Sequence, residues 1–490
     1  MSSSNILERS NYSCINLYKT ISLITASILA LFLSGCDSSS SDDQNESGYL
    51  QFINGSKNSP TIWVTYTNED EEEIVDTIAF GYASRLRNLT SGEYQMVVSW
   101  QETEEDFNDV FEQDIQLFDN KVDIILLTGE FSQPELVFFE FDYDVESLSD
   151  DDDEDQFSLQ VINANQDSAG VDVYLSRDDE TFNEAQLLAS AVYKQISDPV
   201  LFDVEDYKLY LTQTGSSEVI YESNIIEINS NYQYLLLLRE ESGPSESDFT
   251  VDLINNVSTI NFSDKESKTE LRLYNAIVEH ELLPEFTGVI DIDVDGVAED
   301  EVIEDLAQGT MSETLVLSAS DYAMDIIPDG ADLPIAENHF VSLNPNDDKT
   351  VFLYLTEETE EVDDEADETS VYINSLIVDN SNRVSLYDHE IKIINLVQNE
   401  DFDSISTYFV KSNETVDTAD YSTTAFRAVP RSITLPNNTY DVSLIVTVNS
   451  SDLLLDFQTI TLEADSGDRY LIIEEDEMSS SGYSMTLLEQ

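Results

Sequence analysis

Four short segments of this chain repeat one pattern, and the repeat limits the fold more than any other feature of the sequence. Each segment reads apolar, polar, apolar, apolar, Asn, and the four are "LQFIN" at 50, "LQVIN" at 159, "LRLYN" at 271 and "IKIIN" at 391. Their last residues lie 109, 112 and 120 positions apart and are Asn54, Asn163, Asn275 and Asn395. Self-similarity at a near-constant period indicates repeated structural units. We therefore expect four tandem units of about 100 residues each, a usual size for a β-sandwich.

A second marker places a Tyr before an alternating strand in each unit. An apolar residue lies five positions before the Tyr, and the pairs are Leu89/Tyr94, Phe202/Tyr207, Leu317/Tyr322 and Leu435/Tyr440. Apolar residues two and four positions after the Tyr indicate a strand with one buried face. A turn, a Tyr and such a strand resemble the tyrosine corner of immunoglobulin-like sandwiches. We expect structural roles for these Tyr and for the four Asn, since an Asn that ends a strand usually bonds its own turn.

A nearly continuous apolar run comes late in each unit, as in "VDIILLT" at 122 and "YLLLL" at 234. A run that is buried on both faces belongs in the middle of a sheet. The sequence thus predicts an all-β fold of four tandem immunoglobulin-like β-sandwich domains after a lipoprotein signal peptide. The predicted sandwiches span residues 48–146, 157–262, 269–381 and 389–490. Among the few stretches with helical periodicity, "TFNEAQLLASAVYK" at 181–194 is the candidate for a short helix.

The start of the second unit, "LQVINANQDSAGVDVYLS", resembles a family of bacterial β-sandwich domains known only as a domain of unknown function. Members of that family begin with a strand ending in V-N-A-S-P-D and continue with V-D-V-Y-V-D-G. The residues that carry the match are Asn163, Ala164, Asp167, Val171, Asp172, Val173 and Tyr174. The third unit matches through "VIDIDVDG", whereas the first and fourth units lack the Asp and the closing Gly. The resemblance implies tandem immunoglobulin-like domains in an exported bacterial protein, and it assigns no catalytic residue.

The N-terminal segment has the features of a signal peptide for lipid attachment. Arg9 and Lys19 precede an apolar run at 21–33, which is too short to span a membrane but suits a signal-peptide core. The run ends in "LSGC" and resembles the lipobox of bacterial lipoproteins. That resemblance implies cleavage before Cys36 and a lipid on its thiol. The alternative is an ordinary signal peptide with a chance cysteine.

The lipobox implies a place in the cell envelope, with the membrane reached through a lipidated Cys36. The expected signal peptide covers residues 1–35, and a flexible tether of Ser and acidic residues covers 36–47. An outer-membrane or cell-surface position is favoured. The periplasmic face of the inner membrane is the alternative, because Asp37 directly after the lipidated Cys resembles the retention signal of enteric lipoproteins.

The net charge limits the classes of partner, and the positions of the cysteines limit the disulfides that the chain can form. The chain holds 102 Asp and Glu against 20 Lys and Arg, which gives a net charge of −82. Such a surface repels phosphates, so we expect no nucleic-acid partner. Cysteine occurs only at positions 14 and 36. The exported sandwiches therefore have no disulfide, although they are expected in an oxidising compartment.

The stretch "DIDVDG" at 291–296 resembles the acidic half of a calcium-binding loop. Asp291, Asp293 and Asp295 are candidate metal ligands because carboxylate oxygens suit calcium. Position twelve of such a loop is Val302, where an EF-hand requires Glu. Alternation with apolar residues instead indicates a strand with one buried face. We favour the plain strand and keep a weak calcium site as the alternative.

The acidic runs at 150–155 and 357–368 raise the same question of cation binding. We interpret them as solvated spacers, with a low-affinity cation binder as the alternative. The second run lies within the third unit and is expected to form a long, mobile hairpin loop.

Few residues offer catalytic chemistry. The three histidines, at 280, 339 and 389, have no metal-ligand spacing, and no nucleophile or phosphate-loop motif occurs. Trp63 and Trp100 are expected in the core, with exposure of one for sugar stacking as the alternative. We therefore expect a non-enzymatic lipoprotein without a cofactor, whose string of sandwiches binds or adheres to an envelope protein or glycan. The alternatives are a glycan-active or metal-assisted hydrolase with dispersed carboxylates and a passive structural spacer.

Overall fold

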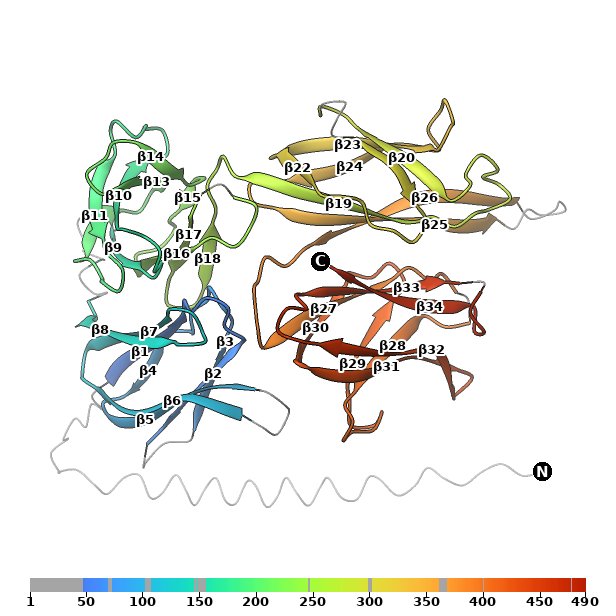
Figure 1. The fold of residues 1–490 in the computed structure, drawn as a ribbon. Coiled ribbons are helices and arrows are strands. Elements are labelled where there is room, and N and C mark those ends of the chain that lie inside the picture. The colour runs from blue at the N-terminus through green and yellow to red at the C-terminus, as the bar shows by residue number, and fades with distance from the viewer. Residues whose placement is uncertain are drawn as a thin grey trace, which may run out of the picture. The chain divides into compact units, whose positions relative to one another are not determined.

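The computed structural model describes residues 47–490 except 69–72, 102–106, 145–147, 149–155, 246, 298–301, 361–367, 400 and 477. The described residues form tandem two-sheet β-sandwiches without an α-helix, which confirms the predicted fold class (Figure 1). Residues Glu46–Gln490 form one compact unit. No helix with the length and hydropathy of a membrane span occurs in this part of the chain. The predicted signal peptide and Cys36 lie outside the described residues.

The strands follow one another through four sandwiches. The first contains β1 (Ser47–Asn54), β2 (Ile62–Thr67), β3 (Ile74–Ile78), β4 (Arg87–Thr90), β5 (Gly92–Gln101), β6 (Phe107–Leu117), β7 (Lys121–Thr128) and β8 (Glu135–Asp142). The second contains β9 (Gln156–Asn163), β10 (Val171–Arg177), β11 (Gln186–Ala191), β12 (Val200–Asp203), β13 (Asp206–Gln213), β14 (Val219–Glu222), β15 (Ile226–Glu227), β16 (Gln233–Glu240), β17 (Phe249–Ile254) and β18 (Thr259–Phe262).

The third and fourth sandwiches have eight strands each. The third contains β19 (Lys268–Ala276), β20 (Val289–Val294), β21 (Ile303–Ala307), β22 (Leu315–Ser318), β23 (Ser320–Pro328), β24 (Ala336–Leu343), β25 (Asp348–Glu360) and β26 (Glu368–Asp379). The fourth contains β27 (Asp388–Asn395), β28 (Ser404–Val410), β29 (Asp420–Ala425), β30 (Arg431–Pro436), β31 (Asn438–Val448), β32 (Ser451–Leu462), β33 (Arg469–Glu475) and β34 (Tyr483–Glu489).

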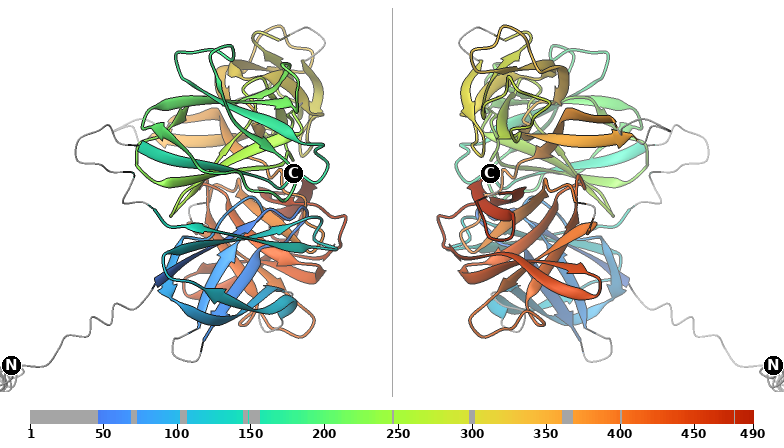
Figure 2. Two further views of the ribbon diagram at one scale, coloured as in Figure 1. Left: turned by 90° about the vertical axis from the view of Figure 1, so that its left-hand side faces the viewer. Right: turned by 90° about the vertical axis from the view of Figure 1, so that its right-hand side faces the viewer.

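All four sandwiches share one topology. Two side views show that each coloured region of the chain is built from strands (Figure 2). In the first, one sheet has the order β4-β1-β7-β8 and the other has the order β3-β2-β5-β6. The strand that ends in the marker Asn runs parallel to the late apolar strand, as β1 does to β7. The pairing partners of the four Asn are Leu127, Leu238, Leu353 and Ile473. The second sandwich adds β15 beside β13 and β18 beside β17.

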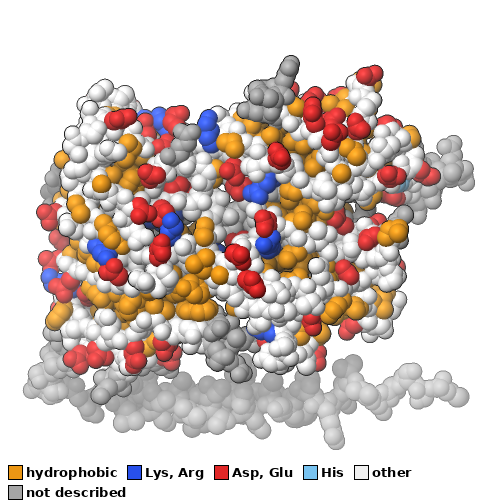
Figure 3. All heavy atoms as spheres, viewed as in Figure 1, with side chains coloured by type: hydrophobic (Ala, Val, Ile, Leu, Met, Phe, Trp, Pro, Cys, Tyr) orange, Lys and Arg blue, Asp and Glu red, His pale blue; other side chains and the backbone are white. Residues whose placement is uncertain are grey.

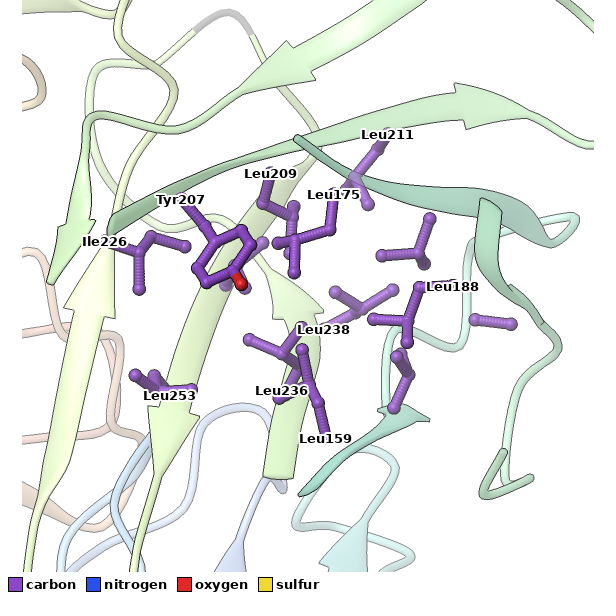
Figure 4. Close-up of a cluster of buried hydrophobic side chains, with 14 of the residues drawn as sticks. Leu159, Leu175, Leu188, Tyr207, Leu209, Leu211, Ile226, Leu236, Leu238 and Leu253 are labelled. Carbon is purple, nitrogen blue, oxygen red and sulfur yellow. The ribbon is translucent and has the colours of Figure 1, made fainter. Parts of the chain in front are cut away.

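Each sandwich has its own apolar core between its two sheets. In the second sandwich, Leu236 and Leu238 of β16 point toward Leu209 of β13 (Figure 4). The Tyr markers also lie in these cores, as Tyr207 does in the same view. Alternation after each Tyr therefore does mark the buried face of a strand.

The late apolar strands are buried on both faces because sandwiches pack in pairs. Ile124 and Leu126 of β7 join Leu235 and Leu237 of β16 in one apolar cluster between the first and second sandwiches. A matching cluster joins Phe352 of β25 to residues of β27 and β33 between the third and fourth sandwiches. The late apolar strand lies in the middle of its sheet, as predicted, since β7 lies between β1 and β8. The second buried face comes from the neighbouring sandwich.

Further contacts join the pairs to each other, so the sandwiches do not form the expected string. Between the second and third sandwiches, Asn346 Nδ2 donates to Glu241 Oε1 at 3.1 Å and to Ser263 Oγ at 3.1 Å. Between the first and fourth, the ring of Tyr387 lies 5.1 Å from that of Trp100. Burial of aromatic area at such junctions favours a compact arrangement over an extended one.

The predicted short helix at 181–194 is wrong. Its centre is strand β11, which pairs with β10, and Leu188 enters the core of the second sandwich. Pairing with the edge of a sheet overrides the helical preference of Glu, Ala and Leu, which is a weak local effect. The long hairpin expected at 357–368 is also shorter, because β25 runs to Glu360 and β26 begins at Glu368. Residues 361–367 lie outside the described residues.

Candidate functional site

The four marker Asn residues connect the two sheets of each sandwich. Each side-chain oxygen accepts the N–H of the residue two positions later, at 2.9–3.3 Å, as expected for a strand end. Each side-chain nitrogen also donates to a carbonyl oxygen of the third strand, which lies in the opposite sheet. The donor and acceptor pairs are Asn54 to Ile78, Asn163 to Ala191, Asn275 to Leu306 and Asn395 to Thr424. These buried amides are structural and offer nothing to a ligand.

The four marker Tyr residues form tyrosine corners. Each hydroxyl donates to the main-chain oxygen four residues earlier, at 2.7–3.0 Å, and these acceptors are Thr90, Asp203, Ser318 and Pro436. Burial raises the pKa of Tyr207 to about 12, so the hydroxyl stays protonated and donates at neutral pH. The predicted resemblance to immunoglobulin-like sandwiches is thus confirmed at the level of this hydrogen bond.

The three candidate calcium ligands lie on or directly after one strand. Ile290, Ile292 and Val294 of β20 are buried, whereas Asp293 and Asp295 are exposed. Asp291 Oδ1 accepts the N–H of Asp305 at 2.8 Å.

No group of three or more acidic, His or Cys side chains able to hold a metal occurs among the described residues. The segment forms strand β20 with its apolar residues inward, as predicted, and its neighbours 298–301 lie outside the description. The first acidic run, 150–155, lies outside the description as well.

Of the two tryptophans predicted in the core, only Trp100 packs against it. Trp100 of β5 packs against the core of the first sandwich and against Tyr387. Trp63 of β2 lies on the opposite face of the same sheet, half-buried, 5.4 Å from the ring of Phe107 in an edge-to-face arrangement. Of the two tryptophans, Trp63 is thus the one that lies on the outer face of its sheet.

A cleft of about 420 Å³ brings Trp63 together with polar groups of the fourth sandwich. The first sandwich contributes Thr61, Trp63, Thr77 and Gln101, and the fourth contributes Asp388, Lys411, Asp420, Thr434 and Pro436. The contact of Tyr387 with Trp100 and Phe131 holds the two walls together. We call this space the Trp63 cleft.

The charged groups of the Trp63 cleft are held in place by partners behind them. Arg383 Nη1 lies 2.6 Å from Asp388 Oδ1, which also accepts the hydroxyl of Ser385 at 2.6 Å. Burial alone would lower the pKa of Arg383, but the charges of Asp388 and Asp468 raise it above its ordinary value. Lys411 Nζ lies 3.7 Å from Asp420 and 3.2 Å from Glu414.

The lining of the Trp63 cleft suits the binding of a small polar ligand. An aromatic ring with a few fixed hydroxyl, amide and carboxylate groups is the usual lining of a site that orients a small polar ligand. Asp388 and Asp420 are each paired with a cation of the chain, Arg383 and Lys411 respectively. The chain has a net charge of −82, and acidic side chains are spread over the face of the molecule seen in Figure 3, which disfavours an anionic ligand.

Sequence reasoning missed most of this cleft. It singled out Trp63, but the members from the fourth sandwich lie more than 300 positions away in the sequence, and no spacing links them to Trp63. The one signal was an unusual concentration of both tryptophans in a single unit.

Comparisons with known proteins give no family and only remote structural likenesses. No protein-family model matches the chain, and no curated protein matches it. Among solved structures, the Bacillus anthracis TIE protein is 12% identical with a TM-score of 0.15, over 95% of this chain and 79% of that one. The chicken CNTN1 FN1-FN3 domains are 8% identical with a TM-score of 0.12, over 61% and 91%. BcpA, the major pilin subunit of Bacillus cereus, is 10% identical with a TM-score of 0.13, over 65% and 99%. Likenesses at these scores carry no argument about function.

Proposed function

We propose that the chain is a lipid-anchored, non-enzymatic protein of the cell envelope that binds a neutral or cationic glycan in the Trp63 cleft. The observation that carries the proposal is the position of Trp63, which lines a polar cleft on the outer face of its sheet instead of filling the core. Stacking of a sugar ring on an indole face uses the apolar side of the sugar, while its hydroxyls reach Gln101 and Asp420. Net charge excludes polyanionic glycans.

Glycan binding is tested by titrating neutral and amino-sugar oligosaccharides into the full chain. The Trp63→Ala variant should bind at least about tenfold more weakly, because truncation of an aromatic anchor costs more than about 1.4 kcal/mol. Phe340→Ala is the matched control, since Phe340 is an aromatic residue on β24 that is 69% exposed and outside the cleft. In a Trp100→Phe background, Trp63 is the sole tryptophan, and its fluorescence should change with bound sugar. Unchanged binding by Trp63→Ala would contradict the proposal.

Anchoring is a separate part of the proposal and has its own test. The lipobox motivates it, and Cys36 is the residue that carries the lipid. Metabolic labelling with a fatty acid should mark the wild-type protein and the Cys14→Ser variant, and should not mark Cys36→Ser. Equal labelling of all three proteins would show that Cys36 is not lipidated. The favoured location is the outer membrane or cell surface, with the inner membrane as the alternative because of Asp37.

A further inference from the structure

One turn is repeated in all four sandwiches and meets the neighbouring sandwich of its pair. A residue with positive φ donates its N–H to the main-chain oxygen of the marker Asn. These turn residues are Gly81, Lys194, Gly309 and Arg427, with φ of 79°, 63°, 74° and 57°. The residues directly before them are Phe80, Tyr193, Gln308 and Phe426. Three of the four turns thus place an aromatic residue before the turn residue, and the third sandwich has Gln308 instead.

Pair packing places each turn against the late apolar strand of the partner. The strand residues concerned occupy equivalent positions, directly after the pairing partner of the marker Asn, and are Thr128, Arg239, Tyr354 and Glu474. A Cβ on Gly81 would come within 3.0 Å of Arg239, and the hydroxyl of Tyr193 lies 3.4 Å from Thr128. Arg427 lies over the ring of Tyr354, and Gly309 lines the same cavity as Glu474.

Three of these four contacts contain a cation of the chain itself. Arg239 lies 5.2 Å from the centre of the Phe80 ring and 2.7 Å from Asp252. Lys194 lies 4.8 Å from the centre of the Tyr193 ring and 2.6 Å from Glu135 of the first sandwich. Arg427 lies 5.1 Å from the Phe426 ring and 5.7 Å from the Tyr354 ring. Each cation therefore meets an aromatic face at a sandwich junction.

The fourth contact has a cavity in place of the cation. Gly309 has no side chain, and no atom lies within 4 Å of the position its Cβ would take. The cavity measures about 380 Å³, and its lining includes the carboxylates of Glu357, Glu474 and Glu475 and the ring of Tyr354. Lys and Arg are absent from this lining. Glu357 has His280 Nε2 at 3.1 Å, whereas no Lys, Arg or His of the described residues forms an ion pair with Glu474 or Glu475. The missing side chain and these two carboxylates without a cation fall at the same place.

We propose that this cavity binds a small organic cation, with a primary ammonium or guanidinium group beside Glu474. The ligand takes the place that Arg427, Lys194 and Arg239 fill at the equivalent contacts. Tyr354 offers it an aromatic face, and Gln308 and Gln398 offer amide oxygens. This site is distinct from the Trp63 cleft and does not depend on glycan binding.

The electrostatics of the cavity favour a cation of this kind over a metal ion. Glu474 Oε2 accepts the hydroxyl of Tyr274 at 2.7 Å, and burial raises the pKa of Glu474. Burial and the nearby charge of Glu357 raise the pKa of Glu475. A bound cation would offset both effects. The carboxylates of the cavity do not form a group that could hold a metal ion in the described structure.

The test uses agmatine, which carries one guanidinium and one ammonium group, titrated into the full chain in 150 mM NaCl by calorimetry. We expect saturable binding of one molecule per chain. Glu474→Gln should weaken it at least tenfold, because the isosteric amide keeps the Tyr274 hydrogen bond but loses the charge. Gly309→Arg should abolish it, because the new side chain enters open space at a φ close to that of Arg427.

Matched controls separate this site from general attraction to an acidic surface. Glu358→Gln removes one exposed charge from the same strand as Glu357. Gly330→Arg adds the same cation at the same φ of 74°, also in open space. Both controls should bind agmatine as the wild type does. Equal loss in the controls, absence of saturable binding, or displacement of agmatine by magnesium at constant ionic strength would each overturn the proposal.

Discussion

At the scale of single residues, the buried carboxylates of this chain differ in whether polar partners offset the cost of burying their charge. Asp252 is fully buried, but its two oxygens receive Arg239 at 2.7 Å and Asn261 at 2.6 Å. Asp123 of β7 lies opposite Glu140 on β8, and its Oδ2 has no hydrogen-bond partner. Burial and the charge of Glu140 raise the pKa of Asp123 to about 6. Asp123 is therefore a carboxylate whose ionised form weakens the fold.

Replacement of Asp123 by Asn should stabilise the protein at neutral pH. A carboxyl with a raised pKa in the folded state contributes stability below its unfolded pKa of about 4, and this contribution is lost as pH rises through about 6. Asp123→Asn should thus gain about 1–2 kcal/mol at pH 8, after allowance for solvent screening, and little at pH 4. Denaturant unfolding at both pH values measures the difference. A gain that is equal at pH 4 and pH 8 would show that charge is not its cause.

At the scale of strands, the side chain of the marker Asn links the two sheets of each sandwich. Its side chain closes the turn after the first strand and reaches the third strand in the opposite sheet. In the fourth sandwich, Asn395 Nδ2 donates to Thr424 at 2.9 Å and its Oδ1 accepts from Val397 at 3.0 Å. Loss of the side chain leaves a buried carbonyl and a buried N–H without partners, which costs more than the net value of the two hydrogen bonds.

We therefore expect Asn395→Ala to destabilise the fourth sandwich by about 2–4 kcal/mol. Amide hydrogen exchange of the full chain should rise in β27 and β29 and stay unchanged in β1 and β3. Asn413→Ala, at an exposed position in a turn of the same sandwich, is the control and should leave exchange unchanged. Unchanged exchange in Asn395→Ala would mean that the contact between the sheets has no energetic role.

The strands and their order could be predicted from the sequence because four copies confirm one another. The interpretation of "DIDVDG" as part of a strand with one buried face is correct, and this strand, β20, occupies the same place in its sheet as β10 and β2. The Asn contact to the opposite sheet was missed, because nothing in a strand pattern states which strand faces a side chain. The polar second residue of a marker segment suggests a face of the strand that is open to solvent. Gln51 is buried instead, and it donates to the main-chain oxygen of Asn255 in the second sandwich at 3.0 Å.

At the scale of the molecule, pair packing and the Tyr387 contact both oppose the electrostatic repulsion of a chain with net charge −82. The apolar clusters between the paired sandwiches are the stronger of these contacts, because they bury strands from both partners. The junction of the first and fourth sandwiches is smaller and has Tyr387 at its centre. We therefore expect this junction to be sensitive to a single substitution at Tyr387, and the same junction forms the Trp63 cleft.

Truncation of Tyr387 should therefore separate the first and fourth sandwiches and lower the affinity of the Trp63 cleft for its ligand at the same time. The Tyr387→Ala variant loses its ring contacts to Trp100 and Phe131, at 5.1 and 5.2 Å, while each sandwich keeps its own core. Small-angle scattering at low salt should give a larger radius of gyration than the wild type, and added salt should reduce the difference by screening the repulsion. Oligosaccharide affinity should fall with it, because the walls of the cleft separate. Tyr372→Ala, half-exposed on β26, should change neither quantity. A larger radius of gyration with undiminished sugar binding would place the glycan site on one sandwich alone.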